Sequence, residues 1–543
     1  MNETSTADPV TDPPTPIELA LGAVMIAFDG PEVPIEVAER LRRVPAAGVT
    51  LFRFSNVRSP GQVGELTADL RAAARSPLLV AADQEGGQLN ALGDAVTPFA
   101  GNMALGAAGD PGLTERVGRA VGRELRAMGV TVNYAPVCDL ATNPVNPAVG
   151  IRSFGDEPGA VGEHVAALVR GLQAVGVAAA LKHFPGLGGV VDDTHHRLAV
   201  LETSPDELAV NELVPFRAGI DAGAKLVMSA HVAVPNLTGD PDLPSTLSRA
   251  VMTDLLRQRL GFDGISITDA LDMAAIPQGS AQVEAVLAAL DAGVDLLLTA
   301  PDADARERIE RGLTDAAGRG GLDLARARRS RGRLRTLTDW LGRFDQPELD
   351  VVACADHLDL ADELARRSIT LVRDDASLLP LRLAPGARVA AIMPAPADLT
   401  PADTTSTVEP GLATELRERF SRVEEIVVPH EPSERDVSAA REATREHDLV
   451  VVGTTAAFTV RGQANLVEAL IDGAVPVVTV ALRAPFDLAA YPRSRTHLST
   501  YGLLRPSLRA LAAALAGDAG IAGRLPAAIP GLHTTGHGVR LGR

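Results

Sequence analysis

Between residue 19 and about residue 300, short apolar runs rich in β-branched residues alternate with longer stretches of helical period. In the longer stretches, such as VGELTADLRAAAR, apolar residues recur every three or four positions, which is the spacing of an amphipathic helix. The runs predict eight strands, each followed by room for a helix: residues 21–28, 48–54, 77–83, 130–137, 177–184, 224–231, 264–270 and 294–300. This order is typical of a (β/α)8 TIM-type barrel.

A second α/β pattern follows the barrel pattern. Its strand candidates are residues 368–374, 388–395, 424–429, 447–454, 475–482 and 496–502. Their alternation with helices predicts a smaller doubly wound α/β sandwich. We therefore expect a disordered leader at 1–18, a catalytic barrel domain at 19–345, a linker and connecting helix at 346–362, and a C-terminal α/β domain at 363–543. The basic helical stretch that ends at about residue 344 is predicted to close the outside of the barrel.

Polar residues gather at the carboxyl ends of the predicted barrel strands. They are Asp83, Asn133, Asp139, Lys182, His183, His231 and Asp269. In a parallel barrel these ends form one face, and that face carries the active site. The alignment therefore predicts an enzyme with its site at this end.

Asp269 ends the apolar strand of the segment GFDGISITDALDM. An ionised carboxylate in such a place can attack an anomeric carbon. Aspartate is equally favoured as a helix N-cap. From this segment alone, both interpretations stand.

The segment LKHFPGLGGVVDDTHHRL, residues 181–198, carries lysine, histidine and aspartate around a glycine-rich loop. Asp193 and His195 are spaced so that the carboxylate could orient the imidazole, which suits a general acid/base. A metal site and a purely structural loop are the alternatives. The metal site is disfavoured because the ligand spacing is irregular and the adjacent His195 and His196 do not easily converge on one ion.

Seven motifs in order strongly resemble the family 3 glycoside hydrolases, in the two-domain form of their β-N-acetylhexosaminidase branch. They are AADQEGG, NYAPVCDL, NPVNPAVGIRSFG, KHFPGLG, DTH, MSAHVAVP and SITDALDM. The similarity is dense over residues 17–345. It is weaker in the second domain, where SITLVRDDASLLPL and GRLPAAIPG carry it.

The resemblance implies a retaining, exo-acting hydrolase that removes terminal β-linked N-acetylglucosamine from cell-wall or chitin fragments. Asp269 would be the nucleophile that forms a covalent glycosyl–enzyme intermediate, and the Asp193–His195 dyad would be the acid/base. The residues that would hold the sugar hydroxyls are Asp83, Arg152, Lys182 and His183. His231 would be structural or part of the subsite wall. The resemblance implies no metal and no cofactor.

Three places depart from the family pattern: Leu187 stands where histidine is usual, Gly189 where aspartate is common, and Gln88-Leu89-Asn90-Ala91 where arginines usually follow DQEGG. They bear on which substrate is accepted. A β-N-acetylglucosaminide phosphorylase is the main alternative, because a histidine acid/base repels an incoming phosphate less than a glutamate would. A β-glucosidase, a non-catalytic sugar-binding sensor and a Schiff-base aldolase using Lys182 are further alternatives.

The net charge of −18 argues against nucleic acid and anionic lipid as partners. No apolar run is long enough to span a bilayer. The first residues, MNETSTADPVTDPPTPIE, lack the features of a secretory signal, so a cytoplasmic location is expected. The two cysteines, Cys138 and Cys354, exclude a disulfide framework. The natural aglycone and the oligomeric state are not predicted.

Overall fold

Eight parallel strands form a closed barrel in the computed structural model, which describes residues 13–146 and 148–542. The strands are β1 Val24–Ile26, β2 Gly48–Leu51, β3 Leu79–Ala82, β6 Val132–Asn133, β7 Ala178–Phe184, β9 Leu226–Ser229, β11 Ile265–Thr268 and β12 Leu297–Leu298. A parallel bridge between Ile267 and Leu296 joins the two ends of the sheet. Each strand lies within one of the predicted runs, so the barrel is confirmed.

A helix follows each barrel strand along the chain. These helices are α2 Ile35–Arg43, α4 Pro60–Ala73, α6 Pro111–Ala127, α7 Pro158–Gln173, α9 Leu213–Asp221, the π-helical η3 Ala250–Arg259, α11 Ala281–Ala292 and α12 Ala303–Gly318. Three of them begin with proline after a side-chain cap, from Ser59, Asp110 and Glu157. Proline tolerates the first helical position because its missing N–H would have no partner there. Shorter elements decorate the loops: α3 Arg53–Asn56, α5 Asn102–Ala108, α8 Pro205–Val210, α10 Pro235–Thr238, η1 Gly150–Arg152 and η2 Ser245–Leu247.

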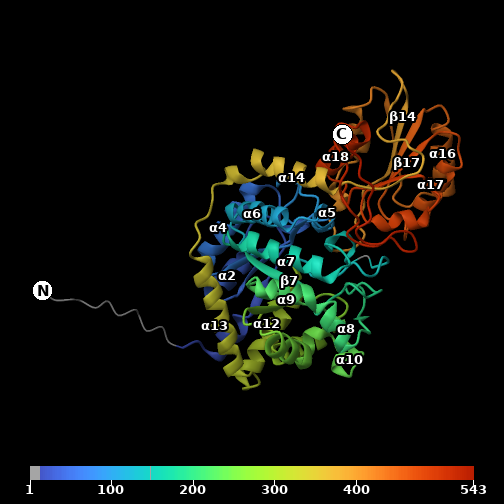
Figure 1. Cartoon of the computed structure of the whole chain (residues 1–543). Helices are drawn as coiled ribbons and strands as arrows, with labels where there is room; N and C mark the ends of the chain where they lie inside the picture. The colour runs from blue at the N-terminus through green and yellow to red at the C-terminus, as the bar shows by residue number, and fades with distance from the viewer. Residues whose placement is uncertain (1–12, 147, 543) are drawn as a thin grey trace.

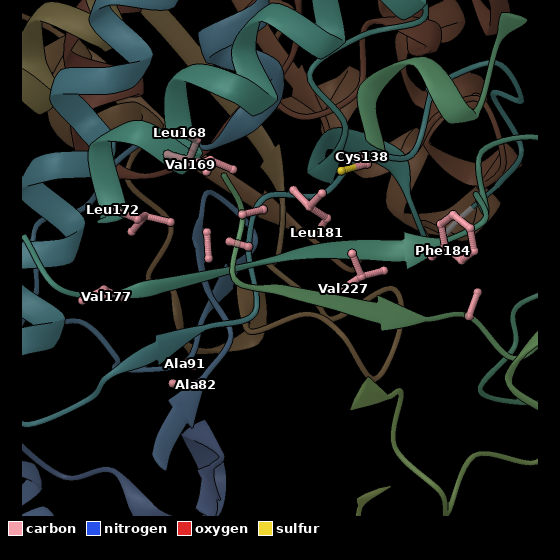
Figure 2. Packing of buried hydrophobic residues seen from close by; sticks show 14 of the residues in the cluster. Ala82, Ala91, Cys138, Leu168, Val169, Leu172, Val177, Leu181, Phe184 and Val227 are labelled. Carbon is pink, nitrogen blue, oxygen red and sulfur yellow. The ribbon is translucent and has the colours of Figure 1, made fainter. Parts of the chain in front are cut away.

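Two apolar layers hold the barrel together. Its interior is filled by side chains such as Met25, Tyr134 and Ile267. The outer layer lies between strands and helices, where Leu181 of β7 and Leu172 of α7 belong to one buried cluster (Figure 2). The buried Cys138 belongs to the same layer, as expected for a small core residue.

The N-terminal end of the barrel is covered by α13, Leu324–Leu341, whose Leu337 and Leu341 pack against the interior cluster. The short helix α1, Pro16–Leu21, lies against α12 and α13. Most of the expected disordered leader, residues 1–12, lies outside the described residues. The last part of that range joins α1, because Thr15 and Glu18 form a capping box that fixes the helix start.

The second sheet has the strand order β13-β18-β17-β16-β14-β15, with β13 antiparallel to β18 and the other pairs parallel. Its strands are β13 Thr370–Asp374, β14 Val389–Pro394, β15 Val423–Val428, β16 Leu449–Thr454, β17 Val477–Ala481 and β18 Thr496–Ser499. One face packs on α15 Leu412–Arg417 and α18 Arg505–Ala516, and the other on α16 Glu434–Ala443 and α17 Arg461–Ile471. The predicted α/β sandwich is confirmed.

The helix α14, Ala355–Ser368, joins the two sheets (Figure 1). It packs against α5 of the barrel side and α18 of the second sheet. Domain boundaries at residues 345 and 363 stay a prediction, supported by the separation of the two sheets. Within the described ranges, every helix is too short or too polar to cross a lipid bilayer.

Candidate active site

The predicted site residues come together at the carboxyl ends of the barrel strands. Asp83 directly follows β3, Asp269 directly follows β11, and Arg152 ends the turn η1. Lys182 and His183 are neighbours on β7, where side chains of a regular strand would point to opposite faces. The pairing of β7 with β9 shifts register between Leu181 and Phe184, and this irregularity allows both side chains to reach the site.

A buried ion-pair network occupies one side of the site. The Lys182 ammonium lies 2.5 Å from Asp83 Oδ1 and 2.5 Å from Glu85 Oε1. Arg152 binds Glu85 with two guanidinium nitrogens, at 3.0 Å and 2.9 Å. Burial opposes the ionisation of Glu85, but the charges of Arg152 and Lys182 lower its pKa to about 2. Burial also works against the charge of Lys182, while Asp83 and Glu85 raise its pKa.

Glu85 was not among the residues predicted from the sequence. Its carboxylate, 1 % exposed, holds Arg152 and Lys182 in place, so it is the centre of the network. Its partner Arg152 lies 67 positions away along the chain, so a local sequence pattern could not predict the pairing. The sequence did hold one sign of its role. Glu85 lies between the end of a barrel strand and two glycines, and a charged residue buried at such a place needs a charged partner.

Asp139 orients His183. Its Oδ2 accepts a hydrogen bond from His183 Nδ1 at 2.6 Å, and its Oδ1 accepts one from the backbone N–H of Leu187 at 2.8 Å. Arg152 Nη2 approaches His183 Nε2 at 3.4 Å. Asp139 and Arg152 thus contact the two ring nitrogens of His183 and fix its orientation.

The Asp193–His195 dyad is formed. Asp193 Oδ1 accepts hydrogen bonds from His195 Nδ1 at 2.6 Å and from the His195 backbone N–H at 2.9 Å. Burial raises the pKa of Asp193, but the hydrogen bonds from His195 outweigh it and lower the value. The His195 side chain is 24 % exposed, so its Nε2 side remains open to substrate and solvent. The backbone carbonyl of His195 accepts from Ala274 N–H at 3.4 Å, which attaches the loop to the turn after Asp269.

Asp269 is a partly buried carboxylate that caps no helix. The next helix, α11, begins at Ala281, so the N-cap interpretation is wrong. Burial raises the pKa of Asp269, but the nearby His183, His231 and His195 lower it overall. The carboxylate is therefore ionised at neutral pH and surrounded by imidazoles.

His231 is a fully buried support for the strand end that carries Asp269. Its Nε2 donates to the carbonyl of Ala270 at 3.1 Å, and its Nδ1 contacts Thr246 Oγ1 at 2.8 Å. Burial lowers the pKa of His231. These contacts support the strand end, and the predicted alternatives for His231, a structural role or a place in the subsite wall, both stay predictions.

The departures from the family pattern lie around this network. Leu187 is buried at 3 % exposure and belongs to the outer apolar layer, and Ala91 is equally buried. A Cβ on Gly189 would meet Leu201 Cδ1 at 3.2 Å. Gln88 is buried against the second domain. Across residues 13–146 and 148–542, no three His, Cys, Asp or Glu side chains are grouped in a way that could hold a metal ion.

A family model matches most of the barrel. The model of the glycosyl hydrolase family 3 N terminal domain covers residues 22–337. The β-hexosaminidase A of Pseudoalteromonas piscicida is 35 % identical over 379 residues, which are 64 % of this chain and 63 % of that protein. The chain thus spans less than two thirds of that relative. The β-hexosaminidase of Stenotrophomonas maltophilia (strain K279a) is 40 % identical over 281 residues, or 51 % of this chain and 82 % of that protein.

Solved structures match the whole two-domain arrangement. A glycoside hydrolase family 3 β-N-acetylglucosaminidase from Paenibacillus sp. str. FPU-7 superimposes with a TM-score of 0.88 at 33 % identity, covering 94 % of this chain and 98 % of that one. A β-glucoside phosphorylase, BglX, has a TM-score of 0.78 at 23 % identity, covering 94 % and 93 % of the two chains. At that identity the second likeness shows the shared fold alone. The relatives' names agree with the branch indicated by the motifs.

Proposed function

The chain belongs to glycosyl hydrolase family 3 and is a glycoside hydrolase, and from this premise we propose that it removes terminal β-linked N-acetylglucosamine with retention of configuration. The observation that carries the proposal is the Asp193–His195 hydrogen bond of 2.6 Å on a loop attached beside the partly buried Asp269. An oriented imidazole and an ionised carboxylate in one site supply the acid and the nucleophile that a retaining mechanism needs.

In the first step, the Asp269 carboxylate attacks the anomeric carbon. The bond from that carbon to the leaving oxygen breaks, and His195 donates its proton to that oxygen. The Asp193 carboxylate accepts from Nδ1–H of His195, which fixes the ring and leaves Nε2 directed outward for proton transfer. The product of this step is a glycosyl ester of Asp269.

In the second step, His195 accepts a proton from water, and the resulting oxygen nucleophile attacks the anomeric carbon. The ester bond breaks and Asp269 leaves as a carboxylate. Two inversions at one carbon give net retention. The low pKa of Asp269, set by the surrounding imidazoles, favours both its ionised resting state and its departure.

We further propose that Asp83, Lys182, Arg152 and His183 hold the sugar in the subsite before the scissile bond. Asp83 is the exposed member of the ion-pair network, with 24 % of its side chain accessible, so its carboxylate can accept from hydroxyl groups. Lys182 and Arg152 are fixed by Glu85 and can donate. Charge-assisted hydrogen bonds of this kind are strong and directional. Cell-wall or chitin fragments as the natural source of the sugar, and a cytoplasmic location, remain predictions of the sequence.

The test is the release of p-nitrophenol from the β-N-acetylglucosaminide and from the β-glucoside, each with and without inorganic phosphate. The proposal expects preference for the N-acetyl substrate and free N-acetylglucosamine as the product. A sugar 1-phosphate formed in the presence of phosphate would reassign the enzyme as a phosphorylase. Preference for the β-glucoside would contradict the substrate class, and folded protein without turnover of either would favour a sugar-binding sensor.

A further inference from the structure

The second domain touches the barrel at the loop that follows β3. Thr404 donates from its backbone N–H and its hydroxyl to the carbonyl of Gln88, at 2.8 Å and 2.9 Å. Its hydroxyl also accepts from the backbone N–H of Asn90 at 3.1 Å. Arg483 donates from Nη2 to Gln88 Oε1 at 2.6 Å. We call these four residues, Gln88, Asn90, Thr404 and Arg483, the interdomain clamp.

Arg483 enters the clamp already fixed by its own domain. Its Nη2 lies 2.8 Å from Asp403 Oδ2, and its Nη1 donates to Thr405 Oγ1 at 3.0 Å. The side chains of Arg483 and Asp403 are 4 % and 0 % exposed. A buried, paired guanidinium has little freedom, so its donor toward Gln88 defines one position for that side chain.

The loop between Gln88 and the sugar-binding network cannot adjust freely. Glu85 is separated from Gln88 by Gly86 and Gly87, whose φ values are +83° and +62°. The Gly87 N–H donates to Phe99 O at 2.8 Å, and a Cβ on Gly87 would lie 2.9 Å from Ala100 O. The backbone is therefore packed tightly between the two side chains. Because Gly86 and Gly87 are held in this packed conformation, we expect a shift of Gln88 to displace Glu85, three positions away.

Glu85 in turn sets the positions of Lys182 and Arg152 through contacts of 2.5 Å and 2.9 Å. A second connection reaches Arg152 more directly. A hollow of about 70 Å³ between the domains is lined by Gln88, by Gly150 and Ile151 of the turn that ends in Arg152, and by Arg483. The second domain thus borders both the loop and the turn that carry sugar-binding residues.

We propose that Arg483 is a positioning residue, through which the second domain holds the loop at 83–90 in the geometry that binds the sugar. The inference rests on the proposed function for the assignment of Asp83, Lys182 and Arg152 to the sugar. It assigns the second domain a part in substrate affinity while leaving the chemical groups to the barrel. Within residues 13–146 and 148–542, no hydrogen bond joins the His195 loop to the clamp, so proton transfer should be unchanged.

The experiment compares four variants of the full chain with the wild type: Gln88→Met, Arg483→Met, the double variant, and the control Arg493→Met. Gln88→Met breaks the clamp and keeps the Arg483–Asp403 pair, so it guards against loss of folding in Arg483→Met. Arg493 is a matched control because it is an arginine of the same domain whose ion pairs, with Glu468 and Asp472, lie on the surface.

We expect the KM for the p-nitrophenyl N-acetylglucosaminide and the Ki of N-acetylglucosamine to rise about tenfold in each single variant, with kcat changed by less than about twofold. The double variant should match the single ones, because both remove one interaction, whereas independent effects would multiply to about a hundredfold. Partial unfolding alone would lower kcat and leave KM unchanged. The control should behave as the wild type.

Amide hydrogen exchange of the segments 84–92 and 399–407 measures, without any substrate, how firmly the clamp holds the two segments. Faster exchange in both segments of Gln88→Met, together with the raised KM, supports the proposal. Unchanged exchange, unchanged KM and Ki, or multiplying effects in the double variant would overturn it. If the wild type fails to hydrolyse the N-acetylglucosaminide, the proposed function fails, and exchange alone then decides whether the clamp holds the loop.

Discussion

The barrel carries a buried ion-pair network at each of its two ends. At the carboxyl end, Glu85 binds Arg152 and Lys182, and the network opens toward solvent at Asp83. At the amino end, Asp295 binds Arg257 at 2.6 Å and Arg333 at 3.1 Å. Glu85 and Asp295 are each 1 % exposed. The central carboxylates of the two networks are thus equally buried, and each is paired with two cations.

The two networks differ in whether every carboxylate has its hydrogen-bond partners within the protein. Asp295 is satisfied on every side, because Ser330 donates to it at 2.5 Å and the backbone N–H of Ser266 at 3.0 Å, and α13 covers the end of the barrel. The network at the carboxyl end instead includes Asp83, a partly exposed carboxylate, in the same site as Asp269 and the dyad. Buried charge with complete partners fixes structure, whereas buried charge with an open acceptor is prepared for a ligand. This agrees with the division between the two faces of such barrels.

The largest effect is expected from Asp269→Asn. The substitution removes the nucleophile and keeps the volume, so kcat should fall by about 10⁴-fold or more. The melting temperature should stay near that of the wild type, because Asp269 has no salt-bridge partner among the described residues. Kinetics on the p-nitrophenyl substrate and thermal unfolding check both halves. An active Asn variant would remove Asp269 from the mechanism.

His195→Ala separates proton transfer from binding. Substrates with poor leaving groups should lose about 10²–10⁴-fold in kcat/KM, because they need a proton on the departing oxygen. Activated aryl glycosides should lose much less. The measurement is a series of aryl N-acetylglucosaminides of rising leaving-group pKa. Equal losses across the series would show that His195 is not the acid.

At the opposite end, Asp295→Asn should act on stability. Removing one partner of a buried ion pair costs about 3–5 kcal/mol in the free energy of unfolding, because the arginines are left unpaired. KM should not change. Unfolding can be followed by the fluorescence of Trp340, the single tryptophan, which belongs to the layer packed against this end. The control Asp291→Asn removes a 69 % exposed carboxylate 3.4 Å from Arg326 and should cost less than about 1 kcal/mol. A raised KM with unchanged stability in Asp295→Asn would contradict the claim that the network at the amino end only stabilises the fold.

The smallest effect concerns pH. The pKa of Glu85 falls from 4.5 to about 2 on folding, so its stabilisation is complete above pH 4.5 and is lost as the pH falls toward 2. Glu85→Gln lacks this dependence. The gap in melting temperature between wild type and Glu85→Gln should therefore narrow between about pH 6 and about pH 3.5. A gap that stays constant would show that Glu85 is not held ionised by its neighbours.

The fold could be predicted because each strand is recognisable from a few consecutive residues. Each barrel strand lies within a short apolar run, and polar residues such as Asp83 and Asp269 follow directly at the strand ends. The helix α1 was missed, although Thr15 and Glu18 have the spacing of a capping box, because the residues around them are rich in proline, threonine and aspartate.

The partners of the site residues could not be predicted, because they are set by tertiary contact. Glu85 meets Arg152 across 67 positions, and Gln88 meets Arg483 across 395 positions and a second domain. The pairing of His183 with Asp139 crosses 44 positions. Only the Asp193–His195 pair, two positions apart, was close enough in sequence to be predicted as a dyad.

The most direct test of the central claim is to trap the covalent intermediate. The enzyme is incubated with a fluorinated β-N-acetylglucosaminide that forms the glycosyl ester quickly and releases it slowly, and its peptides are then analysed by mass spectrometry. The account predicts one sugar on the peptide that contains Asp269, and none in Asp269→Asn. A sugar on any other residue, or continued turnover without an adduct, would contradict it.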